Sequence, residues 1–178
     1  MPSVDIGCGP LHKAADVGID ILPGPAVDIV HDLNQTPWPL DASTFDRILC
    51  LDVLEHLRDL MAVMQEIHRI ATPGARVDIQ VPTGSSRDLY TDPTHIRGFG
   101  YHSFDYFDPM KALFNDYRYS ERTFRVKDVR FVNRPHGKMR TLDRFMCAFA
   151  NRSPELYESR LAFFYPMTAL RFELEVLK

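Results

Sequence analysis

The sequence predicts an α/β fold built on a mostly parallel sheet. Several short runs are almost continuously apolar, such as VGIDIL at residues 17–22 and FDRILCL at residues 45–51. Runs of this kind are typical of strands buried on both faces of a parallel sheet, because a solvent-facing strand alternates with polar residues. A helical pattern lies between two of these runs, which gives the strand–helix–strand order of α/β proteins.

Each expected element follows from a local pattern. Residues 58–71 predict a helix, because apolar residues recur at helical spacing from Leu60 to Ile70 and a Pro-Gly pair follows. The polar residues 83–103 predict a long loop, and loops of this length are usually functional. Ser103 is the expected cap of a helix that starts at the next residue, and another helix is expected around residues 154–164. We expect strands at residues 4–6, 17–22, 27–30, 45–51, 77–81, 120–132 and 170–177.

Length and composition fit one domain of ordinary size. The chain has 178 residues, of which 45% are apolar and 25% are charged, so it can bury a core. We expect a single domain over residues 1–178, with residues 133–169 inserted between the last two strands. No apolar run reaches the roughly 20 residues that span a bilayer, and the first residues lack signal-peptide features. Three cysteines without metal-type spacing indicate reduced thiols and a cytoplasmic protein.

Charge is unevenly distributed along the chain. Residues 118–152 carry ten basic and three acidic side chains, whereas residues 1–117 carry eight basic and seventeen acidic ones. The basic segment could face an anionic substrate, a membrane surface or RNA, but a solvated strand and helix would have the same composition. Residues 133–169 leave open a substrate pocket, an oligomer contact such as a homodimer, and a surface-lying amphipathic helix.

A glycine-rich turn, VDIGCGP at residues 4–10, follows the first expected strand. Glycines in this context let a ligand approach the backbone, as in dinucleotide-binding proteins. Three features argue against a dinucleotide: the third glycine is missing, Asp5 would repel a pyrophosphate, and Asp20 follows Gly9 too closely for the spacing of about 20 residues in that fingerprint. A ligand with a cationic amino group fits better, which indicates S-adenosylmethionine.

Five segments then carry a family resemblance. VDIGCGP, GIDILP, HDLN, FDRILCLDVLEHL and TPGARVDIQVP resemble, in order and spacing, the motifs of class I SAM-dependent methyltransferases, with a domain similar to methyltransferase type 11. The resemblance covers about residues 3–115. It implies a Rossmann-like three-layer sandwich with a mostly parallel seven-stranded sheet, an antiparallel last strand, and S-adenosylmethionine as the cofactor. The chain departs from the family in a shortened N-terminus, where residues 10–16 leave room for only a very short first helix.

The resemblance also implies the cofactor-binding residues. Asp5, Gly7 and Gly9 would line the methionine part, where Asp5 would order the turn or receive the ammonium group. Asp20 would accept hydrogen bonds from the ribose hydroxyls, and Asp32 with the Leu33 backbone would bind the adenine. Leu51 would contact the cofactor through its backbone or side chain. Each aspartate could instead be a turn former or a helix cap. The full predicted set is Asp5, Gly7, Cys8, Gly9, Asp20, Asp32, Leu33 and Leu51.

Two histidines are the predicted catalytic residues. His56 follows the fourth strand, and His95 lies on the long loop that is expected to overhang the same crevice. Methyl transfer to a hydroxyl usually needs a base, and an imidazole titrates in the useful range. His102 is a weaker third candidate. An alternative that we do not adopt is a divalent metal ion bound by Asp52, Glu55, His56 and His95, which would give a mixed nitrogen and oxygen site.

The sequence thus predicts a methyltransferase that acts on a small molecule or a glycan, most simply at oxygen. The first alternative is a protein of the same fold that binds S-adenosylmethionine or S-adenosylhomocysteine, or assembles with a partner, without catalysis. The second is an RNA methyltransferase guided by the basic segment, but the acidic first half makes nucleic acid the less favoured partner.

Overall fold

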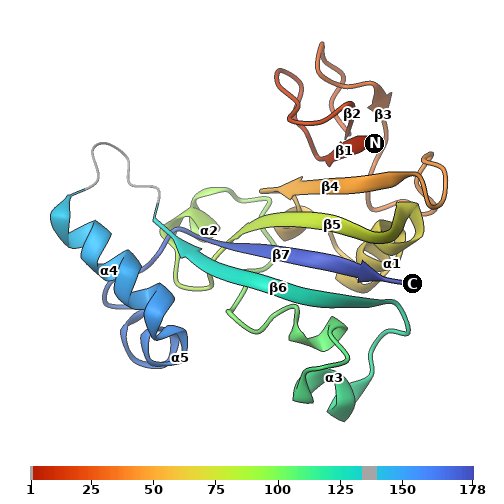
Figure 1. Cartoon of the computed structure of the whole chain (residues 1–178). Coiled ribbons are helices and arrows are strands. Elements are labelled where there is room, and N and C mark those ends of the chain that lie inside the picture. The colour runs from red at the N-terminus through yellow and green to blue at the C-terminus, as the bar shows by residue number, and fades with distance from the viewer. Residues whose placement is uncertain (1, 134–139) are drawn as a thin grey trace.

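Seven strands form one mixed sheet in the computed structural model, which describes residues 2–133 and 140–178 (Figure 1). The strand order is β3-β2-β1-β4-β5-β7-β6. β1 to β5 pair in parallel, whereas β7 is antiparallel to both of its neighbours, β5 and β6. The predicted Rossmann-like fold is therefore confirmed. The strands are β1 (Ser3–Ile6), β2 (Val17–Asp20), β3 (Ile29–Val30), β4 (Phe45–Leu51), β5 (Ala71–Pro82), β6 (Thr123–Val132) and β7 (Ala169–Leu177).

The helices are mostly short, and the longest ones follow β4 and β6. α1 packs its apolar side, including Met64 and Ile67, into the core, and Asp59 caps its first turn by accepting a hydrogen bond from the Ala62 N–H at 3.0 Å. The helices are η1 (Leu54–His56), α1 (Leu60–Ile70), α2 (Arg87–Thr91), η2 (Asp105–Phe107), α3 (Ala112–Tyr117), α4 (Thr141–Arg152), α5 (Pro154–Leu156) and the π-helical η3 (Tyr157–Leu161).

The two faces of the sheet differ. One face of β4 and β5 buries Ile48, Val77 and Ile79 almost completely. The opposite face carries charged residues, and a hollow of about 540 Å³ lies over β4 to β7 there, lined by strand residues and Ala14 with no helix residue among them. On this face Arg76 pairs with Asp78 on the same strand, β5, and with Glu173 across on β7. The described helices therefore leave this face open, and its charges suit it to water.

Several local predictions need correction. No helix forms between Pro10 and Asp16 in the described chain, and β2 and β3 are shorter than expected. Ser103 does not cap a helix, because its hydroxyl accepts a hydrogen bond from the Gly100 N–H, and the following segment divides into η2 and α3. β5 begins six residues earlier than expected and contains Gly74 at φ +75°, with a register shift opposite β4. No helix was assigned to the residues that form α4, although a helix in this part of the chain was left open, and part of the expected insertion, residues 134–139, lies outside the described residues.

Candidate functional site

The glycine turn after β1 is hydrogen-bonded to β2 and lies against Val53, the residue before η1. The N–H groups of Gly7 and Cys8 donate to the Ile19 carbonyl at 2.8 and 3.3 Å. Gly7 and Gly9 both have φ +72°, a region that favours glycine. A Cβ on Gly7 would lie 2.3 Å from Val53 Cγ2, whereas a Cβ on Gly9 would meet nothing within 4 Å. Gly7 therefore serves packing, and Gly9 leaves space where a ligand can reach the backbone.

The two acids beside this turn hold its backbone. Asp20 accepts hydrogen bonds from the Gly9 N–H at 2.8 Å and from the Leu22 N–H at 2.9 Å, one on each carboxylate oxygen. Asp5 is buried and accepts from the Ala14 N–H at 2.8 Å. Burial raises the pKa of Asp5, the Ala14 hydrogen bond opposes this, and the negative charge of Asp20 adds to the rise. Each Asp20 oxygen keeps a lone pair for a ligand hydroxyl.

The remaining predicted cofactor residues follow the next strands. Asp32, after β3, accepts from the backbone and side-chain N–H groups of Asn34, both at 3.0 Å, and these bonds lower its pKa. Asp32 therefore also stabilises a turn, which was the alternative to a cofactor-binding role for each aspartate. Leu33 is buried, and Leu51 is exposed at the end of β4. The thiol of Cys8 contacts the Ala26 carbonyl oxygen at 3.7 Å, and burial raises its pKa.

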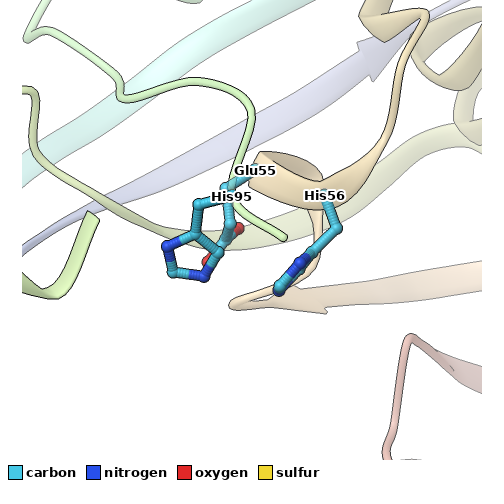
Figure 2. Close-up of side chains that lie close together, drawn as sticks. All are labelled: Glu55, His56 and His95. Atoms are coloured by element: carbon cyan, nitrogen blue, oxygen red, sulfur yellow. The ribbon is translucent and has the colours of Figure 1, made fainter. Parts of the chain in front are cut away.

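The two predicted catalytic histidines meet in space, as Figure 2 shows together with Glu55. Their ring centroids lie 4.6 Å apart, with His56 on η1 and His95 on the loop that follows α2. The Ile96 N–H donates to the Glu55 carbonyl at 2.9 Å and joins this loop to η1. The Glu55 side chain is buried, and its Oε1 lies 3.8 Å from His95 Nε2. The structure thus brings together residues that are about forty positions apart.

Hydrogen bonds place a proton on Nδ1 of both rings. His95 Nδ1 lies 3.2 Å from the Leu89 carbonyl, which only accepts, so Nδ1 carries a proton. His56 Nδ1 lies 2.8 Å from Thr94 Oγ1, and the Thr94 hydroxyl donates to Asp92 Oδ1 at 2.6 Å. Thr94 therefore accepts from His56 Nδ1, which leaves Nε2 of the neutral His56 ring unprotonated. Both rings are therefore held through Nδ1, and the structure places their Nδ1 protons on the surrounding loop.

The electrostatics favour the neutral form of His56. Burial lowers its pKa and the neighbouring His95 lowers it further, while the carboxylates of Asp92 and Asp52 act in the opposite direction. The net pKa is below 6.5, so the imidazole is unprotonated at neutral pH. Such a ring can accept a proton from a substrate hydroxyl.

The alternative metal set is only partly assembled. One ligand atom each of Glu55, His56 and His95 lie within 4.8 Å of one another. Asp52 stands outside this group: it has φ +54°, and its Oδ2 accepts from Gln80 Nε2 at 2.7 Å. These three side chains are of the types that bind a divalent cation, but a histidine lone pair that would bind the cation could instead accept a proton from a substrate.

His102 occupies a different place. Its two ring nitrogens lie 2.7 Å from Asp105 Oδ2 and 2.5 Å from Glu155 Oε1. This ring therefore bridges the loop to the segment before η3 and has no nitrogen directed at the His56–His95 pair. The sequence also gave no reason to select Thr94 or Leu89, although the Asp92-Pro93 turn that precedes Thr94 was a visible signal for an ordered loop.

Fold and site together define a class of protein. A parallel sheet with a glycine turn after its first strand, and with acids after the next strands, is a Rossmann-like nucleotide-binding architecture in which ligands occupy the carboxyl edge. The sequence matches the family described as "Methyltransferase domain" over residues 2–144, and the chain belongs to this family. Its cofactor is S-adenosylmethionine.

Solved structures agree on the fold. A SAM-dependent methyltransferase from Archaeoglobus fulgidus has a TM-score of 0.59 and 15% identity, over 97% of this chain and 85% of that one. An S-adenosylmethionine-dependent methyltransferase from Mesorhizobium loti has a TM-score of 0.54 and 14% identity, over 98% and 90%. The [4+2]-cyclase SpnF has a TM-score of 0.56 and 15% identity, over 98% and 74%, so the fold also occurs in a protein named for another reaction. A comparison with curated proteins gives no match. Among the described residues no helix combines the length and apolar character needed to cross a bilayer.

Proposed function

We propose that the protein transfers a methyl group from S-adenosylmethionine to a hydroxyl of a small-molecule or glycan acceptor. The observation that carries this proposal is the pair of imidazoles, His56 and His95, whose ring centroids lie 4.6 Å apart, with the proton of the neutral His56 ring held on Nδ1. The pair is connected to the turn through Val53, which packs against Gly7 and lies three residues before His56. The acceptor and the reaction at oxygen are part of the proposal, whereas the cofactor follows from the family.

The residues at the carboxyl edge fit this cofactor. The open space at Gly9 suits close approach of a ligand, and Asp20 retains acceptor capacity for ribose hydroxyls. The buried carboxyl of Asp5 and the exposed Leu51 would border the methionine part, and Asp32 with Leu33 would border the adenine. When bound, S-adenosylmethionine supplies an electrophilic methyl group on a sulfonium centre.

The chain's own contribution is to orient the acceptor and to receive its proton. His56 Nε2 would accept the proton of the acceptor hydroxyl, and the imidazolium would keep its Nδ1–H bond to Thr94. Asp92, hydrogen-bonded to Thr94, would stabilise this positive charge. His95 cannot carry a second charge at 4.6 Å without repulsion, so one of the two rings stays neutral.

Binding of S-adenosylhomocysteine, measured by calorimetry, tests the first half of this proposal. We expect micromolar affinity for the wild type and at least about a tenfold loss for Asp20→Ala, because charge-assisted hydrogen bonds disappear. Asp28→Asn is the matched control, since Asp28 lies near the same strands but accepts from the Gly18 N–H and from Lys13 instead. A wild type that binds no S-adenosylhomocysteine would refute the proposal.

A methyl-transfer screen over hydroxyl-bearing acceptors tests the second half. His56→Gln should abolish turnover while cofactor affinity is retained. Activity that persists after exhaustive chelation supports the base and rejects the metal alternative at Glu55, His56 and His95. Cofactor binding without methyl consumption on any acceptor would favour the alternative of a non-catalytic binding protein.

The RNA alternative has less support. Of the basic residues in 118–152, Arg125, Lys127 and Arg130 pair with Asp108, Glu175 and Asp128 respectively. Their charges are therefore partly neutralised within the sheet. Absence of an RNA shift at low salt would exclude this alternative. The cytoplasm remains the proposed compartment, since Cys8, Cys50 and Cys147 are all free thiols.

A further inference from the structure

The segment between β6 and β7 exposes several large apolar side chains, among them the two most exposed in the described chain. Within residues 140–165, called here the helical lobe, Phe163 is 81% exposed and Phe164 is 86% exposed. Three more large apolar side chains of the lobe are exposed, namely Leu142, Phe145 and Leu156. Isolated exposed apolar residues are ordinary, but five within one short segment indicate a surface that meets something apolar.

In the helical lobe the carboxylates are engaged by other groups, whereas the arginines are not paired with a carboxylate. Its three carboxylates are already engaged: Asp143 accepts from the Tyr165 hydroxyl at 2.5 Å, Glu155 contacts His102, and Glu158 accepts from the Tyr101 N–H at 2.8 Å. The arginines are exposed, and within the described chain none of them lies within 4.0 Å of a carboxylate. They are Arg140, Arg144, Arg152 and Arg160.

We propose that the helical lobe binds the surface of an anionic lipid bilayer. Exposed phenylalanines that enter the headgroup region, with unpaired arginines beside them, are the features of interfacial helices. A second copy of the chain is the main alternative occupant. It fits less well, because a symmetric interface made by the lobe would gather the arginines of both copies while the carboxylates of the lobe are already engaged.

The lobe lies where membrane binding would affect the candidate site. Figure 1 shows α4 and α5 together at one end of the sheet, away from β1, β2 and β3. Glu155 and Glu158 connect the lobe to His102 and Tyr101, in the loop region that also carries His95. A bilayer under the lobe would therefore lie close to this loop. The inference does not depend on methyl transfer, since it concerns only what the lobe contacts.

Vesicle flotation of the full chain tests the proposal. At low ionic strength we expect binding to vesicles of phosphatidylcholine with an equal amount of phosphatidylglycerol, weak binding to phosphatidylcholine alone, and release by salt. Phe163→Ser with Phe164→Ser should reduce binding by about tenfold. Arg144→Gln with Arg160→Gln should reduce it by about fivefold on the anionic vesicles only. Met110→Ser, at a 70% exposed residue outside the lobe, should leave binding unchanged.

Other results would overturn the inference. Wild-type protein that stays with neither vesicle excludes a membrane role for the lobe. Light scattering that finds a dimer, converted to a monomer by the double phenylalanine variant, would assign the surface to self-association instead. Circular dichroism establishes that each variant is folded. Calorimetry with S-adenosylhomocysteine on the same samples separates the two proposals, because loss of cofactor binding would concern the proposed function alone.

Discussion

Substitution of the two glycines of the first turn by alanine should separate packing from ligand access. Gly7 and Gly9 share φ +72°, so alanine meets the same backbone penalty at both positions, about 1–2 kcal/mol. Alanine also lowers the conformational entropy of the unfolded chain, which offsets about 0.4–1 kcal/mol of this penalty. Gly9→Ala should therefore destabilise the protein by about 1 kcal/mol, since its Cβ would meet nothing within 4 Å.

Gly7→Ala adds a steric term. Its Cβ would lie 2.3 Å from Val53 Cγ2, so Val53 or the turn must move, at a further cost of about 1–3 kcal/mol. The total is about 2–4 kcal/mol. At about 2–4 °C per kcal/mol for a domain of this size, Gly7→Ala should lower Tm by roughly 4–16 °C and Gly9→Ala by roughly 2–4 °C. Urea unfolding monitored by circular dichroism gives both free energies.

A double-substitution cycle checks the cause. Val53→Ala placed in the Gly7→Ala background should recover part of the lost stability, because it removes the methyl groups that clash. Calorimetry should show the opposite order for the affinity for S-adenosylhomocysteine, with a greater loss of affinity in Gly9→Ala than in Gly7→Ala. Equal stability losses at the two glycines, or no coupling between Gly7 and Val53, would refute the reasoning.

Three further predictions concern titratable groups. Burial raises the pKa of Glu66, but the hydrogen bonds from Arg69 and from the Trp38 N–H, together with the Arg69 charge, outweigh burial and lower the pKa. Glu66→Gln should therefore cost about 1–3 kcal/mol of unfolding free energy above pH 4.5, and denaturation should show this difference fading as the pH falls below 4.5. Burial lowers the pKa of His102, but its two carboxylate partners outweigh burial and raise the pKa overall. The stability lost in His102→Asn should therefore be largest below pH 6.5 and vanish at high pH. A loss of stability that does not depend on pH would contradict this prediction. NMR titration of His56 should give a pKa below 6.5 that rises in His95→Asn, and an unchanged value would show that the two rings are not coupled.

The sheet could be predicted because its signals are local. The apolar runs at residues 45–51 and 170–177 reappear as β4 and β7 with nearly the same bounds. The antiparallel β7 came from the family resemblance and the strand order was not predicted, since pairing partners leave no mark in a single sequence. The open sheet face could not be derived, because the charged residues of β5 read equally well as solvated turn residues. α4 was missed although Leu142, Met146 and Phe149 stand at helical spacing, which was a usable signal.

The candidate site was predicted in its parts but not in its arrangement. His56 and His95 could be selected as chemically suitable, and their expected common crevice agrees with rings 4.6 Å apart. Their roles, like those of the cofactor residues, remain predictions. The tautomers depend on the Leu89 carbonyl and on Thr94, contacts that only the folded loop creates. Ser103 shows the reverse error, because a good capping residue instead accepts a local hydrogen bond from the Gly100 N–H, three residues earlier.

The position of β7 has a consequence for biosynthesis. This strand comes last among the seven in the chain but lies between β5 and β6 in the sheet. A nascent chain that has not yet reached residue 169 therefore exposes the free edge of β5 and leaves β6 without any neighbour. Unpaired strand edges beside apolar residues are sites of aggregation, and long-range pairing of this kind forms slowly. Ribosome-bound or truncated chains that lack β7 should therefore depend on chaperones, whereas chains that include β7 can complete the sheet.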